Sequence, residues 1–281
     1  MKPCFFCKNP DSVTAARRRW PGDRRGEILL WRSFHPLSQR QTPQATRVVS
    51  CRVVHTSITA ALAAEAATLQ AVISGLTEAD LDRASPCPPW TIRELSCHVL
   101  IGADRIPQAL AELADDTAPL ITTVHYFRPD HRFSPATNAD RIQTARALAA
   151  RLGGPSAIAA ELGRRRRHSI ELFASAPSSR TIHTRHGDRM LLTDFARTRV
   201  VELAVHGLDL AFGLDRQPWM TSAAADILIH LLLPGGRSDE FCEGLNCDRV
   251  GLIARITGRV RLCAVDEQLL TGAGVMWLAL G

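Results

Sequence analysis

The sequence is poor in aromatic residues and contains no long uninterrupted apolar run. Aromatic side chains make up 5% of its 281 residues. Its first residues lack the apolar core of a signal peptide, and its longest apolar stretches are short and carry polar residues. We therefore expect a cytoplasmic protein with no secretory signal and no transmembrane helix. The chain also has no internal repeat.

The eight cysteines do not form the pattern of a disulfide framework or a zinc ribbon. They are scattered through a long chain, which favours reduced thiols. Cys4 and Cys7 form a CxxC pair, but a ribbon needs a second pair at ribbon spacing, and none follows. A metal role for this pair is therefore the weaker alternative. We expect Cys97 to pack as a small apolar residue.

The net charge of +6 comes from the N-terminal part of the chain. Residues 1–50 carry ten basic and three acidic side chains, whereas the remainder carries 24 basic and 25 acidic ones. Because the N-terminal part is also rich in Arg, Pro, Ser and Gln without a helical period, we predict a disordered basic extension over residues 1–52. Nucleic acid is an unlikely partner, since the rest of the chain is almost neutral.

Apolar residues recur at helical spacing in several segments, and this pattern predicts an all-α bundle. Thr91 and Glu94 form a capping box at the start of one helix. Thr193 is predicted to cap another, which Gly213 ends. Residues 117–138 are predicted to form a loop and 180–192 an extended hairpin, while 270–281 is predicted to be a strand or irregular. The predicted helices are 55–76, 91–106, 138–175 with a break at 153–155, 194–212, 222–233 and 247–258.

The helix over residues 194–212 contains the most informative pattern. Nearly every position from 200 to 212 is apolar or small, which predicts a buried helix. Glu202, His206 and Asp209 are the exceptions, and their spacing places them on one stripe, which Arg199 extends by one turn. A buried carboxylate is costly unless it is paired or binds a metal. Side chains four residues apart on a helix have Cβ atoms roughly 6 Å apart, so Glu202 and His206 can share one cation.

The helix that follows Thr91 supplies a third candidate ligand. His98 is the one strongly polar side chain in an apolar run, and it could be either a core histidine or a metal ligand. Together with Glu202 and His206 it would form a two-histidine, one-carboxylate set with an open position, as in catalytic zinc sites. Zinc is the first choice, with nickel, iron or manganese as alternatives. Arg199 and Asp209 would then orient the carboxylate and the imidazole. The alternative is a ladder of buried ion pairs, Arg199–Glu202 and His206–Asp209, without metal.

The chain resembles a known family at these residues. The segments Cys87–His98 and Arg199–Leu210, the lead-in Gly187–Asp194 and the opening Leu62–Asp80 resemble the metal-binding domain of mycothiol-dependent maleylpyruvate isomerase, within the DinB-like superfamily. The resemblance implies a four-helix bundle with long crossover connections over residues 53–215, and a small C-terminal segment, 216–281, packing on the bundle. It also implies metal ligation by His98, Glu202 and His206.

The resemblance further implies a reaction that depends on a low-molecular-weight thiol. In the isomerase the thiol, often mycothiol, adds to maleylpyruvate, a carbon–carbon bond rotates, and elimination gives fumarylpyruvate. We therefore predict a metal-dependent transferase or isomerase whose partners are a small thiol and an electrophilic acceptor. One alternative is a non-catalytic metal- or ligand-binding regulatory module. Another is a nucleic-acid-associated protein acting through the basic extension and its CxxC pair. A homodimer is one possible assembly of the chain.

Overall fold

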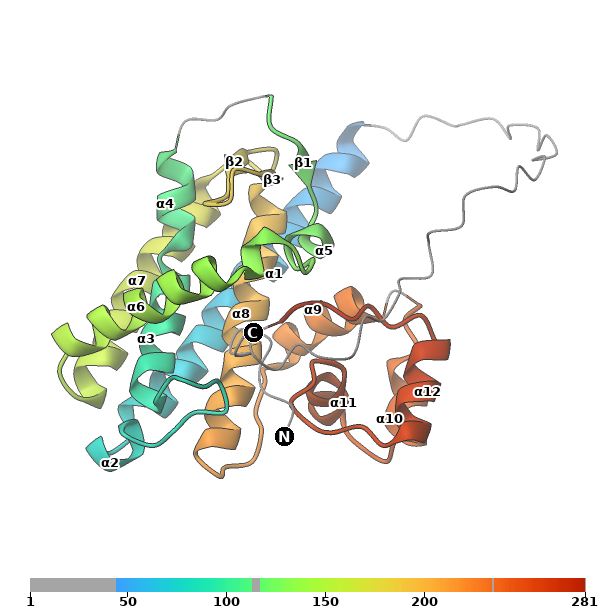
Figure 1. Ribbon diagram of the computed structural model, residues 1–281. Helices are drawn as coiled ribbons and strands as arrows, with labels where there is room; N and C mark the ends of the chain where they lie inside the picture. The colour runs from blue at the N-terminus through green and yellow to red at the C-terminus, as the bar shows by residue number, and fades with distance from the viewer. Residues whose placement is uncertain (1–43, 113–116, 234, 281) are drawn as a thin grey trace, which may run out of the picture.

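The computed structural model describes residues 44–112, 117–233 and 235–280, and most of them are helical. The predicted CxxC pair and most of the predicted basic extension lie outside these residues. The helices and strands, shown in Figure 1, are α1 (Gln44–Ser74), α2 (Glu78–Leu81), α3 (Ile92–Ala103), α4 (Arg105–Ala111), β1 (Leu120–Ile121), α5 (Thr123–Tyr126), η3 (His131–Phe133), α6 (Pro135–Arg151), α7 (Pro155–Ser175), β2 (Thr181–His183), β3 (Arg189–Leu191), α8 (Leu192–Gly213), α9 (Ser222–Leu232), α10 (Ser238–Gly244), α11 (Arg249–Ile256) and α12 (Ala264–Gly272).

Four of these helices pack around a common core. Helix α1 packs against α7 and α8, and α3 packs against the same two helices on the other side, so that the four close into a bundle. Helix α6 covers α3 from outside. The predicted capping box begins α3, because Thr91 Oγ1 accepts from the Glu94 N–H while the Glu94 carboxylate accepts from the Thr91 N–H. The all-α prediction is confirmed.

A small sheet lies at one end of the bundle. Its strand order is β1-β3-β2, with β1 parallel and β2 antiparallel to β3. The predicted hairpin over 180–192 is confirmed, and Gly187 supplies the positive φ of 84° that its turn requires. The loop prediction for 117–138 was incomplete, since this stretch holds β1, α5 and η3. Thr122 and Asp130 cap the two short helices with their side chains, a local signal that the sequence contained.

Helix α8 is the most buried element of the described chain. Its start differs from the prediction: the helix begins at Leu192 with Leu191 as N-cap, so Thr193 lies inside the first turn. The reason is that β3 ends at Leu191 and runs directly into α8, which leaves no connecting residue for a separate cap. Thr193 is nevertheless buried, and the polar positions Arg199, His206 and Asp209 are also buried.

The C-terminal segment contains four helices, where the sequence predicted two. Helix α9 packs against α1 and α8, α11 packs on α9, and α10 packs on α11. In Figure 1 these helices and α12 form a group beside the bundle. Residues 273–280 are irregular, and the backbone N–H of Ala279 donates to the Phe127 carbonyl at 3.0 Å. The chain end is thereby attached to the bundle.

One stretch of α1 is unusually apolar for its length. Residues His55–Ser74 are long and apolar enough to cross a membrane by length and composition alone. The sequence analysis predicted no transmembrane helix, whereas this stretch meets the criterion of length and composition. In the fold, Ile58, Leu69 and Ile73 of this helix are fully buried in the core of the bundle. Core helices of bundles pass the same test, because they too are mostly apolar.

Candidate metal centre

The three predicted ligands meet at one point in the bundle. His98 comes from α3, and Glu202 and His206 come from α8, one turn apart. One donor atom from each side chain can be chosen so that all three lie within 4.8 Å of one another. Residues about 100 positions apart in the chain are thus brought together by the packing of α3 against α8. Two imidazole nitrogens and a carboxylate oxygen are a donor set that suits zinc and similar divalent metals.

The local packing sets the orientation of the two imidazoles. The Trp90 ring stacks on His98 with ring centroids 4.6 Å apart. The His98 and His206 rings lie edge to face, with centroids 5.1 Å apart. His206 Nε2 lies 3.6 Å from Glu202 Oε2. Trp90 therefore packs against the ring of the candidate ligand His98, while the His206 imidazole faces the Glu202 carboxylate.

The electrostatics of the site distinguish the two histidines. Burial, together with the neighbouring charge of His206, holds the pKa of His98 well below its ordinary value. Burial also opposes the charge of His206, but the hydrogen bond to Asp209 and the nearby Glu202 carboxylate outweigh it and raise the pKa of His206 to about 9. For Glu202, burial is outweighed by His206 and Arg199, which lower its pKa. The carboxylate is therefore charged, as a metal ligand must be, and His206 would release a proton on coordination.

Asp209 lies directly behind His206. The His206 Nδ1–H donates to Asp209 Oδ2 at 2.9 Å, and the aspartate side chain is fully buried. Arg259, which follows α11, donates to both oxygens of Asp209, at 3.1 Å and 3.0 Å. The buried carboxylate therefore has two cationic neighbours. A carboxylate on the far nitrogen of a ligating histidine is a common arrangement in metal sites, because it fixes the tautomer and the ring orientation.

Arg199 is placed differently from its predicted position beside the Glu202 carboxylate. Its guanidinium donates to Thr198 Oγ1 at 3.0 Å and to the Tyr126 hydroxyl at 3.2 Å, and it lies over the rings of Tyr126 and Phe195. The predicted Arg199–Glu202 contact is not among the ion pairs of the described chain. Arg199 acts on Glu202 only through its charge.

A second group of donor atoms shares His206. Cys87, His206 and Asp209 also place one donor atom each within 4.8 Å, and all three residues are buried. Both Asp209 oxygens already accept hydrogen bonds from Arg259, however, and a cation there would face that guanidinium. The first group is therefore the better metal site.

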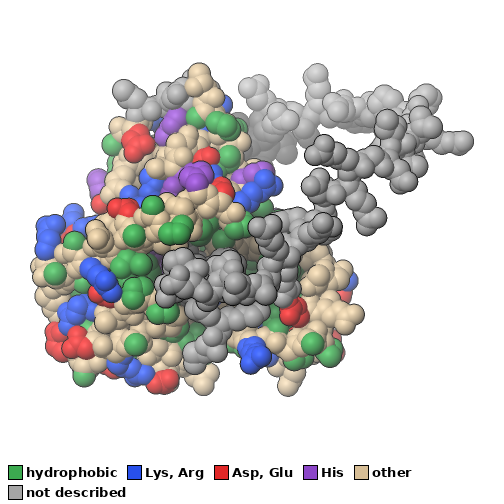
Figure 2. Space-filling view, in the orientation of Figure 1, with side chains coloured by type: hydrophobic (Ala, Val, Ile, Leu, Met, Phe, Trp, Pro, Cys, Tyr) green, Lys and Arg blue, Asp and Glu red, His purple; other side chains and the backbone are tan. Residues whose placement is uncertain are grey.

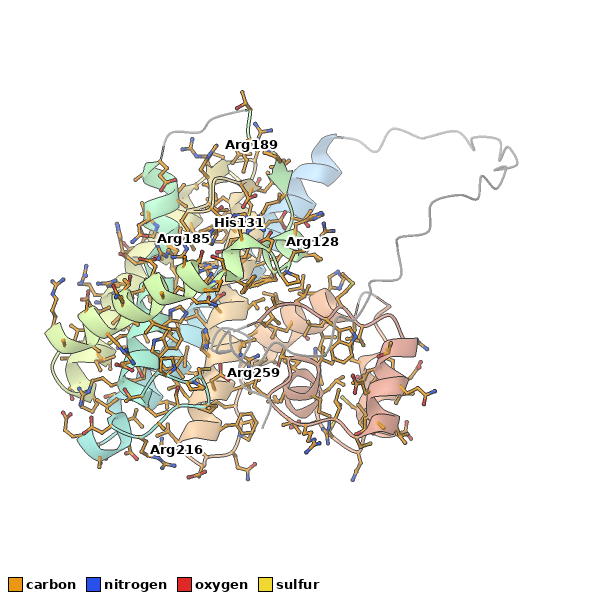
Figure 3. The ribbon with its side chains drawn as sticks, in the orientation of Figure 1. Arg128, His131, Arg185, Arg189, Arg216 and Arg259 are labelled. Atoms are coloured by element: carbon orange, nitrogen blue, oxygen red, sulfur yellow. The ribbon has the colours of Figure 1, made fainter. Side chains whose placement is uncertain are left out.

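A pocket opens from the predicted ligands toward the surface. His98 and Glu202 are part of its lining. Figure 2 shows histidine and basic side chains gathered on the upper part of this face, and Figure 3 shows Arg185 and His131 above α6. The arginines that line the pocket are Arg105, Arg132, Arg141, Arg185 and Arg199.

The arginines of the pocket lining differ in their neighbours. Arg132 pairs with Asp130 and, at 2.5 Å, with Asp188. Arg185 lies 3.9 Å from Asp140, whereas Arg105 donates to the neutral Gln108 side chain. Burial and then the charges of Arg185 and Arg199 lower the pKa of Arg105 to about 10. Among the residues that line the pocket, Glu202 is the one carboxylate beside five arginines, so positive charge predominates in the lining.

Sequence reasoning missed Arg259 and, apart from Arg199, the arginines of the pocket wall. These residues lie on segments that are distant in the chain, and each resembles an ordinary surface arginine in its local sequence. The one available signal for Arg259 was the buried Asp209, which required a cation in addition to His206.

Comparison with known proteins identifies the family. No curated protein matches the chain. A crystal structure of the mycothiol-dependent maleylpyruvate isomerase is 15% identical, with a TM-score of 0.36, and the match covers 66% of this chain and 68% of that one. A histidine-to-alanine mutant of that isomerase gives 14% identity, a TM-score of 0.35 and the same coverage.

The family assignment rests on a match to a family model. A family model described as mycothiol maleylpyruvate isomerase N-terminal domain matches residues 62–211, more than half of the chain. The matched range contains His98, Glu202 and His206. The resemblance seen in the sequence is thus confirmed, and the chain belongs to the mycothiol maleylpyruvate isomerase N-terminal domain family.

Proposed function

We propose that this protein is a metal-dependent enzyme that uses mycothiol or a similar small thiol to isomerise or conjugate an anionic electrophilic acceptor. The observation that carries the proposal is the convergence of His98, Glu202 and His206, two of which, His98 and Glu202, also line a pocket rich in arginine. A metal held there by three side chains would keep a coordination position open toward the pocket. Family membership supports the thiol as co-substrate.

The side chains of the site have separate tasks in this proposal. His98, Glu202 and His206 would hold the metal, and Asp209 would orient His206. The bound metal, with zinc as first choice, would keep a coordinating thiol deprotonated at neutral pH and so make it nucleophilic. No cysteine of the chain need serve as nucleophile. Cys97 fits this, since it is buried and burial raises the pKa of its thiol to about 12.

The pocket wall supports an acceptor that carries negative charge. Arg105 and Arg199 hydrogen-bond only to neutral groups among their described contacts, so their charges are available to a ligand. An arginine fork binds a carboxylate with two parallel hydrogen bonds, which fixes its orientation as well as its position. The wall would thereby hold the acceptor near the thiolate while it reacts.

We also propose that the protein is cytoplasmic, that residues 53–215 form the metal-binding unit, and that 216–281 form a small segment packed on it. Neither nucleic acid nor a membrane has a role in the proposed reaction.

Metal analysis and turnover together test the proposal. Wild type, His206→Ala and the control His230→Ala, which removes an exposed histidine of α9, are compared for bound zinc and for thiol-dependent turnover of an acceptor panel. We expect one metal per chain and turnover in wild type and the control, and loss of both in His206→Ala. Metal binding without turnover, and a cobalt spectrum that thiol does not change, would instead favour the non-catalytic module.

The arginines require a separate measurement. Arg105→Met should weaken binding of a dicarboxylate acceptor by about tenfold, since a hydrogen bond to a charged group contributes about 1.5–3 kcal/mol. The affinity of the Arg105→Met variant for an uncharged acceptor should equal that of wild type. Arg249→Met on α11, far from the pocket lining, is the control.

A further inference from the structure

The C-terminal segment reaches the metal centre through one side chain. Arg259 lies where the group of C-terminal helices meets α8 (Figure 3). Its Nε and one terminal nitrogen donate to the two oxygens of Asp209, at 3.1 Å and 3.0 Å. Asp209 in turn accepts from His206 Nδ1 at 2.9 Å. A continuous chain of hydrogen bonds therefore runs from the C-terminal segment to a predicted metal ligand.

Arg259 is itself held rigidly. Its other terminal nitrogen donates to the carbonyls of Thr257, at 2.9 Å, and Leu280, at 2.7 Å. Its side chain is 4% exposed. Gly258 precedes it with a φ of 78°, a conformation that glycine adopts without strain, and this turn directs the chain from the end of α11 back toward α8. The guanidinium is thus fixed by four hydrogen bonds.

The paired contact has a consequence for His206. A carboxylate held through a single oxygen can rotate, whereas a fork that binds both oxygens fixes the carboxylate plane. With that plane fixed, Oδ2 stays toward Nδ1, and the opposite ring nitrogen stays toward Glu202, 3.6 Å away. Arg259 also neutralises a fully buried charge that His206 alone would have to balance.

We propose that Arg259 is a positioning residue of the metal centre, and that the C-terminal segment is a working part of the site because it supplies this side chain. The proposal rests on the ligand role of His206 in the proposed function. Arg259 is neither a candidate ligand nor a residue of the pocket lining, and it is linked to the centre by its hydrogen bonds to Asp209.

Zinc affinity of purified full-length variants tests the proposal without reference to turnover. Arg259→Met keeps the length of the side chain but removes the fork, and Arg259→Lys keeps the charge but loses the paired contact. Arg249→Met is the matched control, because Arg249 is on the same segment and also pairs with an aspartate, Asp226, but at the surface. Affinity is measured by competition with a chromophoric chelator.

We expect Arg259→Met to weaken zinc binding by about 10–100-fold, the usual effect of losing a partner of a ligand. Arg259→Lys should show a smaller loss and Arg249→Met none. The cobalt-substituted Arg259 variants should also show a changed ligand-field spectrum, which a general loss of stability would not produce. If Arg259→Met does not fold, Arg259→Lys decides: reduced affinity supports the proposal, and wild-type affinity overturns it.

A His206→Ala arm separates the two proposals. If His206→Ala binds zinc as wild type does, the ligand assignment itself fails. If His206→Ala loses zinc while a folded Arg259→Met binds it with wild-type affinity, only the positioning role of Arg259 is overturned. An equal loss in Arg249→Met would also overturn it, because the effect would not be specific to the hydrogen bond with Asp209.

Discussion

Two carboxylates are completely buried among the residues that the structure describes, and their surroundings differ. Asp209 on α8 and Glu65 on α1 are both 0% exposed. Asp209 is bound by Arg259 and His206, and despite its burial these two cations lower its pKa. Glu65 accepts only from the N–H and hydroxyl of Thr221, at 2.9 Å and 2.7 Å, so burial dominates and raises its pKa.

The two buried carboxylates, Asp209 and Glu65, therefore have different roles. Asp209 is kept charged by cations, and it stands behind a candidate metal ligand. Glu65 connects α1 to Thr221, the N-cap residue of α9, and one of its oxygens has no hydrogen-bond partner in the described chain. Asp209 is therefore held in its charged form, whereas Glu65 links the bundle to the C-terminal segment through its hydrogen bonds to Thr221.

The largest expected effect comes from removing the charged carboxylate. Asp209→Ala leaves Arg259 buried without its partner, and breaking a buried pair in this way costs about 3–5 kcal/mol. We expect the free energy of unfolding, measured by urea titration of the metal-free protein, to fall by this amount. A loss below about 1 kcal/mol, the typical value for a surface ion pair, would show that Asp209 is not a strongly paired buried charge, and the contrast with Glu65 would not hold.

An intermediate effect is expected at Glu65, and it depends on pH. Because the folded-state pKa of Glu65 is raised, its stabilising contribution is complete below the unfolded value of 4.5 and is lost as pH rises through the folded value. Glu65→Gln removes this dependence. The unfolding free energy of the variant relative to wild type should therefore increase from pH 4.5 toward pH 8.

The control for this measurement is Glu240→Gln on α10, which changes an exposed glutamate. Its stability should follow wild type across the same pH range. Parallel curves for Glu65→Gln and wild type would show that Glu65 ionises in the fold as easily as in the unfolded chain, and the contrast with Asp209 would disappear.

The smallest effect is expected at the surface. Arg249 and Asp226 form a pair at 2.5 Å, with side chains 38% and 65% exposed. Exposed pairs contribute about 0.2–1 kcal/mol and are screened by salt. We expect Asp226→Ala to lower the unfolding free energy by less than about 1 kcal/mol, and less still at high salt. A loss as large as that of Asp209→Ala would mean that burial does not decide the strength of these pairs.

Local sequence patterns were sufficient for the long helices of the bundle and for the polar stripe, but not for short helices such as α5, α10 and α12. The apolar surroundings of Glu202, His206 and Asp209 identified α8 as buried, and helical periodicity alone places these side chains on one face. The cap of α8 was misassigned because a capping residue is recognised from its neighbours, while the start of this helix is set by the strand β3 that runs into it.

The sequence by itself determined the helical segments, the buried character of α8 and the chemical types at its polar positions, because these depend on spacing along one element. Only the tertiary structure decided which distant groups surround them: Trp90 on His98, Tyr126 on Arg199, and Arg259 on Asp209. The physical reason is that a buried charge requires a partner but does not specify it. The packing of α3 and the C-terminal segment against α8 selects the residue that fills that role.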